Sequence, residues 1–213
     1  RLEKLVREEQ TVDKEELRGK ITESAQTIVE HVDSIKRLAN EFSQFARMPH
    51  AEFASQDLNE IVSNVVEPFG TSHQEIVFQV IADRAIPRVY LDREQIRRVL
   101  INLIDNAIGA IRDMGPQREL AQAAPKITIK TSFDTRSRMV SFEVADTGPG
   151  ISAQDKLKIF EPYITTKKGG TGLGLAIVTT IVAEHQGRVR GFDNSPQGAR
   201  FVVDLPLHPQ RST

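Results

Sequence analysis

Apolar residues in the N-terminal part of the chain recur at steps of four and three in alternation. This seam continues for more than three heptads and consists of Ile21, Ala25, Ile28, Val32, Ile35, Ala39, Phe42 and Ala46. A period of 3.5 residues is typical of helices that pack almost parallel in a coiled coil or a four-helix bundle. The alternative is one amphipathic helix that lies on its own domain. The strict alternation favours the bundle.

The residues on either side of this seam predict a helical hairpin. Three apolar residues indicate the end of an earlier helix: Leu2, Leu5 and Val6. The polar stretch from Glu8 to Arg18 is then the turn between two antiparallel helices. The long helix ends at Met48-Pro49-His50, because proline disfavours helical geometry in the residue before it.

From about Phe53 onward the pattern becomes mixed. Helices are expected over residues 57–69, 92–113 (capped by Asp92) and 171–186. Strands are expected over 75–82, 89–91, 127–131, 140–144, 188–193 and 200–205, with loops over 116–125 and 148–174. The fold class is therefore α+β. Residues 1–52 form a helical hairpin, and residues 53–213 form an α/β sandwich of one mixed sheet under a layer of helices.

Composition narrows the classes of function. A hydrophobic fraction of 39% supports a packed core, and a net charge of -1 gives no global field that would attract nucleic acid. The absence of cysteine excludes disulfides and thiolate metal sites and fits a cytoplasmic protein. No apolar run approaches the roughly 20 residues that a membrane span needs. Because the chain starts at Arg1 without a signal-peptide pattern, we expect it to be part of a longer protein.

A pair of asparagines is the first candidate for chemistry. Asn102 and Asn106 lie four residues apart in a strongly helical stretch and therefore share one helix face. A side-chain amide can donate and accept hydrogen bonds, and its oxygen can bind a hard cation. Taken alone, two asparagines on a helix are more often surface residues or caps.

Two glycine-rich segments follow. In Asp146-Thr-Gly-Pro-Gly-Ile151, a carboxylate at the end of a strand can accept a hydrogen bond from an exocyclic amine, although a tight turn is the simpler interpretation. Gly169-Gly-Thr-Gly-Leu-Gly174 opens a helix, where exposed N–H groups and the helix dipole favour an anion. The second segment lacks the Gly-Lys-Ser/Thr of a P-loop and the preceding strand of a dinucleotide-binding fingerprint.

Together with Phe160-Glu-Pro-Tyr-Ile-Thr-Thr-Lys167, these segments resemble, in order, the N, G1, F and G2 boxes of sensor histidine kinases. Those kinases belong to the GHKL superfamily, whose ATP-binding domain has the Bergerat fold. The resemblance covers about residues 53–207 and implies ATP or ADP and Mg²⁺ as ligands. The implied nucleotide-binding residues are Asn102, Asn106, Asp146, Gly148, Gly150, Ile151, Phe160, Thr166, Lys167, Gly170, Thr171, Gly172, Leu173 and Gly174.

The resemblance also implies individual roles. Asn106 matches the asparagine that binds Mg²⁺ at the ATP phosphates, and Asp146 matches the aspartate that reads the adenine amine. Residues 152–169 match the ATP lid, with Phe160 as its anchor and Lys167 near the phosphates. The chain departs from the family pattern in two places. Many of these kinases carry a basic residue at the position of Gly109-Ala110, so that Lys167, Lys168 or Arg112 would supply the charge, and Ala199 lacks the hydroxyl of the usual threonine.

One residue separates a kinase from an ATPase. Hydrolytic GHKL members carry a glutamate four residues before the magnesium asparagine, and this chain has Asn102 there. Because an amide cannot accept the proton of a water molecule, the sequence favours transfer of the γ-phosphoryl group over hydrolysis. The alternatives are a GHKL ATPase, an anti-sigma-type serine kinase, or a non-catalytic nucleotide-binding dimerisation module.

The phosphoacceptor is expected outside this chain. None of the five histidines has the flanking acidic residue and proline of the family's acceptor; they are His31, His50, His73, His185 and His208. We therefore expect no catalytic residue in the chain, no autophosphorylation by the chain alone, and an acceptor on the first bundle helix, upstream of Arg1. Residues 1–52 would be a partial dimerisation domain, and residues 53–213 the catalytic ATP-binding domain.

The run from Asn40 to Pro49 resembles the end of the second bundle helix in nitrogen-regulation kinases of the NtrY type. The resemblance implies a homodimer through the helical bundle and an NtrX-type response regulator as partner. It also implies upstream transmembrane, HAMP and PAS segments, which would make this chain the cytoplasmic portion of an inner-membrane sensor. Nucleic acid is not an expected partner.

Overall fold

The computed structural model describes residues 14–46, 50–115, 124–165 and 170–209. The chain separates into two compact units, Arg1–Arg47 and Met48–Thr213. We describe each unit by itself. Within the described ranges, no helix combines the length and the apolar composition that a membrane crossing needs.

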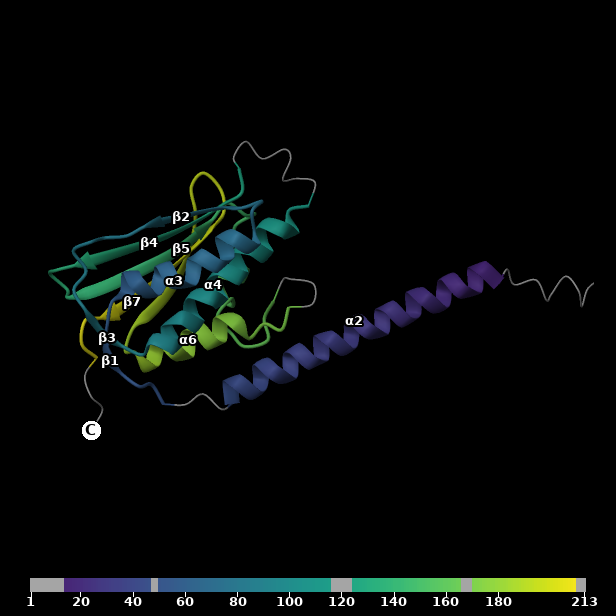
Figure 1. Ribbon diagram of the computed structural model, residues 1–213, viewed down its shortest axis with the longest axis horizontal. Coiled ribbons are helices and arrows are strands. Elements are labelled where there is room, and N and C mark those ends of the chain that lie inside the picture. Colours follow the sequence, from purple (N-terminus) through teal and green to yellow (C-terminus); the bar gives the residue numbers. More distant parts are fainter. Residues whose placement is uncertain (1–13, 47–49, 116–123, 166–169, 210–213) are drawn as a thin grey trace, which may run out of the picture. The chain divides into compact units, whose positions relative to one another are not determined.

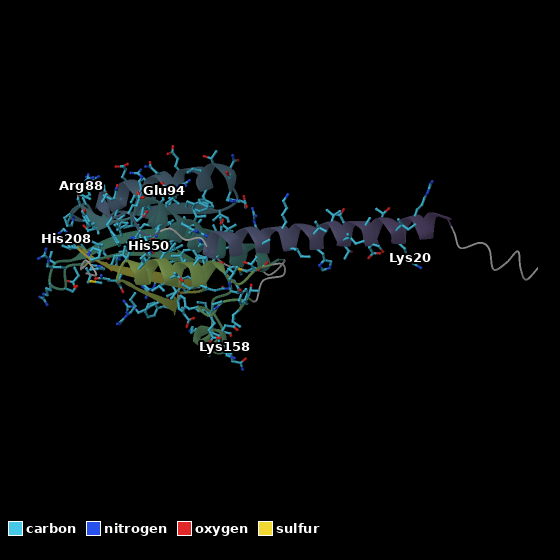
Figure 2. The ribbon with its side chains drawn as sticks, turned by 90° about the horizontal axis from the view of Figure 1, so that it is seen from below. Lys20, His50, Arg88, Glu94, Lys158 and His208 are labelled. Carbon is cyan, nitrogen blue, oxygen red and sulfur yellow. The ribbon has the colours of Figure 1, made fainter. Side chains whose placement is uncertain are left out.

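The first unit contains one long helix, α2 (Lys14–Ala46). The predicted seam lies on this helix, and four of its apolar residues are exposed within the unit, by 59% at Ile21, 63% at Ile28, 55% at Val32 and 66% at Ile35. Figure 2 shows the described side chains of α2 as sticks, with Lys20 labelled near the N-terminal end of the helix. The predicted turn is wrong over residues 14–18, which are helical because this glutamate-, lysine- and leucine-rich stretch has high helix propensity. The predicted earlier helix and the rest of the turn lie outside the described residues.

The second unit is built on a five-stranded mixed sheet. The strands are β2 (Val77–Ile81), β4 (Lys126–Asp134), β5 (Met139–Asp146), β7 (Ala199–Pro206) and β6 (Arg188–Asp193), in that spatial order. Strand β2 runs parallel to β4, and the remaining neighbours are antiparallel. In Figure 1 the helices α3 (Leu58–Ser72), α4 (Arg93–Asp113) and α6 (Gly174–Glu184) lie together on one face of this sheet. The expected α+β fold, with a mixed sheet under a helix layer, is confirmed.

The core lies between the helix layer and the sheet, and α4 is its centre. This helix packs on α3, α6 and β5, and its apolar face is almost fully removed from solvent. Removing such a side chain from water stabilises the fold by about 1.5–3 kcal/mol. The buried residues of α4 include Ile96, Val99, Leu100, Leu103, Ile104, Ala107, Ile108 and Ile111.

Two helices begin at aspartates that cap them. The Asp92 carboxylate accepts a hydrogen bond from the Gln95 N–H (3.0 Å), as the sequence predicted. The Asp57 carboxylate accepts bonds from the N–H groups of Asn59 (2.9 Å) and Glu60 (3.2 Å). These bonds satisfy donors that have no partner inside their own helix.

Three features differ from the sequence-based expectation. Strand β1 (Ala54–Gln56) was not expected, because three residues carry no readable alternation; it pairs antiparallel with β3 (Val89–Leu91). Helix α6 begins at Gly174, three residues later than predicted, and a short 3₁₀ helix, η1 (Asp155–Leu157), interrupts the expected loop.

Candidate nucleotide-binding site

The structure brings the asparagine pair of α4 against the first residue of α6. Both asparagines are half-buried, and Asn102 Nδ2 donates a hydrogen bond to the Arg98 carbonyl at 2.8 Å. A Cβ atom placed on Gly174 would lie 3.0 Å from Asn102 Oδ1 and 3.9 Å from Asn106 Nδ2. Glycine at this position therefore leaves a cradle between the asparagine amides and the N-terminus of α6.

The N-terminal end of α6 suits an anion. Its N-cap residue, Leu173, makes no side-chain capping bond to the helix, so that no side chain at that position occupies the donors of the first turn. The N–H groups and the dipole of such a turn favour negative charge. The predicted magnesium ligand, Asn106, lies beside this turn, and Mg²⁺ needs few protein ligands when it also binds phosphates and water. The residues at this position therefore fit a magnesium–phosphate group.

Asp146 is held rigidly at the end of β5. Its side chain is buried, with 2% of the residue exposed. Its Oδ1 atom accepts hydrogen bonds from the N–H groups of Gly148 (2.8 Å) and Ala199 (3.1 Å), and its backbone carbonyl accepts one from Asn194 Nδ2 (2.7 Å). Two donors on one carboxylate oxygen set the rotation of the carboxylate, and with it the direction of Oδ2. This suits a group that reads the position of an amine.

The turn between β6 and β7 approaches Asp146 so closely that it requires glycine. Gly198 has a φ of +115°, and a Cβ atom there would lie 1.9 Å from the Asp146 carbonyl oxygen. On the other side, Gly148 is buried against α4, with the place of its missing Cβ 3.1 Å from the Ala110 Cβ. The small residue at position 110 thus admits the Gly148 loop to the surface of α4. The predicted Gly150 lies beside this turn, its missing Cβ 3.2 Å from the Gly198 carbonyl oxygen.

The first half of the predicted lid packs on the sheet. Phe160 meets Phe201 of β7 edge to face, with ring centroids 6.3 Å apart. The Cδ1 atoms of Ile159 and Ile151 lie 3.0 Å and 3.6 Å from the place where Gly191 lacks a Cβ. Lys156 of η1 forms an ion pair with Asp193 of β6. Lys158, labelled in Figure 2, lies on the exposed side of the same turn.

The backbone of Tyr163, in the predicted lid, is in direct contact with the backbone of Gly172. The N–H of Tyr163 donates to the Gly172 carbonyl at 3.0 Å. A Cβ on Gly172 would lie 2.5 Å from the Tyr163 carbonyl carbon, and Gly172 itself has a φ of +69°. Gly172 is therefore required for lid packing, in addition to any role beside the phosphates.

The remaining predicted residues differ in their surroundings. Gly170 is exposed, and the half-buried Thr171 accepts a hydrogen bond from the Leu173 N–H at 3.3 Å. The Leu173 side chain is completely buried, which places it in the core. Two predicted nucleotide-binding residues, Thr166 and Lys167, lie outside the described residues, as does Lys168.

Arg112 is engaged away from the cradle. Its Nη2 atom lies 3.1 Å from Glu75 Oε1 and 2.9 Å from His73 Nδ1. A backbone hydrogen bond at Glu75, together with the Arg112 guanidinium, holds the pKa of the Glu75 carboxyl below its ordinary value. The structure thus gives no support for Arg112 as the charge at the phosphates.

Several residues of the site were not identified from the sequence. Asn194 and Gly191 gave only weak signals, since Asn-Ser-Pro reads as an ordinary turn and one glycine in a strand reads as a bulge. Their contacts depend on strands distant in sequence. Within the ranges that the structure describes, no cluster of three or more His, Cys, Asp or Glu side chains is arranged to hold a metal ion.

Known proteins show the same architecture. The chain is 34% identical over 181 residues to the nitrogen regulation protein NtrY of Azorhizobium caulinodans, a match that takes in 85% of this chain and 23% of that protein. The catalytic domain of histidine kinase ThkA in a nucleotide-free form is 35% identical, with a TM-score of 0.63 over 74% of this chain and 97% of that one. ThkA in complex with the response regulator TrrA is 27% identical, with a TM-score of 0.70 over 90% of this chain and 53% of that one.

The chain thus spans less than half the length of the curated relatives that it matches. The profile of one protein family, described as histidine kinase-, DNA gyrase B-, and HSP90-like ATPase, matches residues 91–209. This segment runs from the end of β3 to just beyond β7 and includes the asparagine pair, Asp146 and the whole lid. Because the match covers more than half of the chain, the chain belongs to the family of histidine kinase-, DNA gyrase B-, and HSP90-like ATPases.

Proposed function

We propose that this chain is the ATP-binding catalytic part of a two-component sensor histidine kinase. It binds Mg-ATP and presents the γ-phosphoryl group to a histidine on a dimerisation helix, from which the group passes to an aspartate of a response regulator. Asn106 holds the magnesium ion, and Asp146 accepts a hydrogen bond from the adenine amine. When bound there, Mg²⁺ would supply positive charge that offsets the phosphate charge during phosphoryl transfer.

One juxtaposition carries this proposal. The cradle at Gly174 lies between the side-chain amides of α4 and the N-terminus of α6. The buried carboxylate of Asp146 also lies beside α4, since Gly148 packs on Ala110 of that helix. The site thus combines a metal ligand, an anion-binding turn and an amine acceptor, which are the three parts of Mg-ATP recognition. The likeness to ThkA, which is named a histidine kinase, supports the kinase assignment over other members of the family.

Asn102 supports phosphoryl transfer over hydrolysis. Its amide is anchored by the bond to the Arg98 carbonyl, and its Oδ1 faces Gly174. The resemblance assigns Asn102 to the position at which hydrolytic members carry the glutamate that activates water. An amide cannot take the proton. The chain should therefore bind ATP and turn it over slowly. Steady ATP turnover at the rate of a dedicated ATPase of this family would contradict the kinase assignment.

The partners are part of the same proposal. The exposed seam on α2 suits a second copy of the chain, which would complete a helical bundle. A response regulator is the second partner, supported by the complex of ThkA with TrrA, and we propose one of the NtrX type because of the likeness to NtrY. An inner-membrane sensor with this chain on its cytoplasmic side completes the proposal.

The test is calorimetric titration of the chain with Mg-ATP, next to Asn106→Asp and Asp146→Asn variants. Asp105→Asn is the matched control, because this exposed residue adjoins Asn106 on α4. We expect both site variants to weaken binding by at least tenfold and the control to bind like the wild type. Equal binding of Mg-ATP by the wild type and all three variants would contradict the roles assigned to Asn106 and Asp146.

Labelling with radioactive ATP tests the transfer itself. We expect no acid-labile phosphate on the chain alone, and labelling of an added fragment that carries the upstream acceptor helix. Two described histidines already have hydrogen-bond partners: His73 contacts Arg112, and His185 contacts the backbones of Asp92 and Ile181. Label on His31 or His50, which are exposed, would show that the acceptor lies within this chain.

A further inference from the structure

Asn194 connects the turn between β6 and β7 to the backbone of Asp146, the residue proposed to read the base. Its side-chain Nδ2 donates to the Asp146 carbonyl at 2.7 Å, across a sequence separation of 48 residues. Its Oδ1 accepts a hydrogen bond from the Ser195 N–H (3.0 Å), and its own N–H donates to the Gly198 carbonyl (2.8 Å). This one side chain thus closes its own turn and also holds the end of β5.

The same turn contacts Asp146 at two further points. The Ala199 N–H donates to Asp146 Oδ1 at 3.1 Å, and Gly198 lies in van der Waals contact with the Asp146 backbone through the space where its Cβ is missing. The turn therefore determines both where the backbone of Asp146 lies and how its carboxylate is rotated. Ala199 can contribute only its backbone, so that Asn194 supplies the side-chain bond.

We propose that Asn194 is a positioning residue for base recognition: it fixes the carboxylate of Asp146 so that the site selects a nucleotide with an exocyclic amine over one with a carbonyl at that position. This inference rests on the proposed function, in which Asp146 reads the adenine amine. A buried carboxylate that is free to rotate or shift would bind an amine less well and would reject a carbonyl oxygen less strongly, because the discrimination depends on geometry.

The simpler interpretation is that Asn194 only builds the turn, as asparagine commonly does. The variant Asn194→Asp separates the two roles. Aspartate retains an oxygen that can accept from the Ser195 N–H and is equally suited to turns, whereas the donor to the Asp146 carbonyl is lost. Asn194→Ala removes both bonds. Gln197→Ala is the matched control, because Gln197 is an exposed residue of the same turn.

The experiment measures the Kd of the full chain for Mg-ATP and for Mg-ITP, which carries a carbonyl in place of the amine. Thermal unfolding without nucleotide monitors the fold. We expect the wild type and Gln197→Ala to prefer ATP. For Asn194→Asp we expect ATP binding to weaken about five- to tenfold, as for the loss of one hydrogen bond, while the Kd for ITP changes less than twofold.

The outcomes are separable. A wild-type preference for ATP that is retained in Asn194→Asp, or an equal weakening of ATP and ITP, overturns the positioning role and leaves the proposed function intact. A wild type that binds ATP and ITP equally overturns the assignment of Asp146, and the positioning role with it. Loss of the preference for ATP over ITP in Asn194→Asp and Asn194→Ala, but not in Gln197→Ala, establishes the positioning role of Asn194.

Discussion

The imidazole of His185 accepts a hydrogen bond at Nε2 from the backbone N–H of Asp92, with a donor–acceptor distance of 3.0 Å. Its other nitrogen, Nδ1, lies 2.8 Å from the Ile181 carbonyl. Because a carbonyl can only accept, Nδ1 carries the proton and the ring is neutral. His185 as a whole residue is 1% exposed, and its ring also packs against that of Phe53, with centroids 4.9 Å apart.

The hydrogen bonds around His185 connect the start of α4, the end of α6 and the segment that precedes β1. Asp92 caps α4 and also accepts a hydrogen bond from the Glu52 N–H at 2.7 Å, while Glu184, at the end of α6, accepts one from the Ala51 N–H at 2.7 Å. The segment that precedes β1 is therefore held by groups on the two helices that form the nucleotide cradle.

The buried histidine makes the stability of the second unit dependent on pH. Burial lowers the pKa of His185, and the hydrogen bond to the Ile181 carbonyl, together with the nearby Asp92 and Glu184 carboxylates, offsets this only in part. The unfolded chain therefore binds a proton at His185 more readily than the folded chain does. The free energy of unfolding rises with pH between the folded and the unfolded pKa of this residue. The contribution of His185 is complete above the unfolded pKa of about 6.5 and is lost as the pH falls through the lower folded pKa.

Denaturant unfolding between pH 5 and 8 checks this dependence. We expect His185→Gln to be less stable than the wild type at pH 8 and to lose less stability on acidification. His208→Gln is the control, because it removes an exposed histidine of the same unit in place of the buried one. An unchanged slope in His185→Gln would show that other groups cause the dependence.

The two capping aspartates should differ in importance. Asp57→Ala removes a cap from α3 and should lower the free energy of unfolding by about 1 kcal/mol. Asp92→Ala removes the cap of α4 and also the bond to Glu52, so it should lower that energy by about 2 kcal/mol. Chemical denaturation at pH 7.5 measures both. Equal losses would mean that the bond to Glu52 adds no net stability.

Gly172 should not tolerate a side chain. The variant Gly172→Ala places a Cβ within 2.7 Å of two backbone atoms of Tyr163 and strains a backbone with a φ of +69°. We expect a loss of about 1–3 kcal/mol in the free energy of unfolding and faster proteolysis of the lid. Gly70→Ala is the control, since no atom lies within 4 Å of its added Cβ and alanine favours the helix. Equal lid proteolysis in the two variants would exclude the contact as the anchor.

The exposed seam of α2 should mediate self-association. We expect the wild-type chain to sediment as a concentration-dependent dimer, because burial of the seam removes apolar surface from water. A double variant with Ile28→Asp and Val32→Asp should sediment as a monomer. Thr27→Asp is the control, since this exposed residue lies off the seam. If the double variant dimerises as the wild type does, the seam is not the interface.

Local sequence determined the elements that depend on near neighbours. The cap at Asp92 and the period of α4 predicted a helix over 92–113, and strand alternation predicted the two strands that the structure shows as the antiparallel neighbours β4 and β5. These signals are local, because a helix repeats every 3.6 residues and a strand every two. The order and spacing of the motif segments also predicted the fold of the second unit, although no single segment was specific.

Tertiary structure alone decided the contacts between distant segments. The parallel pairing of β2 with β4, the approach of Gly198 to Asp146 and the bond from Asn194 join segments that are close only after folding. Gly172 was expected only as a nucleotide-binding residue. In the structure its lack of a side chain also makes room for the Tyr163 backbone, which lies nine residues earlier. The sequence shows where a glycine or an asparagine stands, but only the packed structure shows which neighbouring residue requires that side chain or its absence.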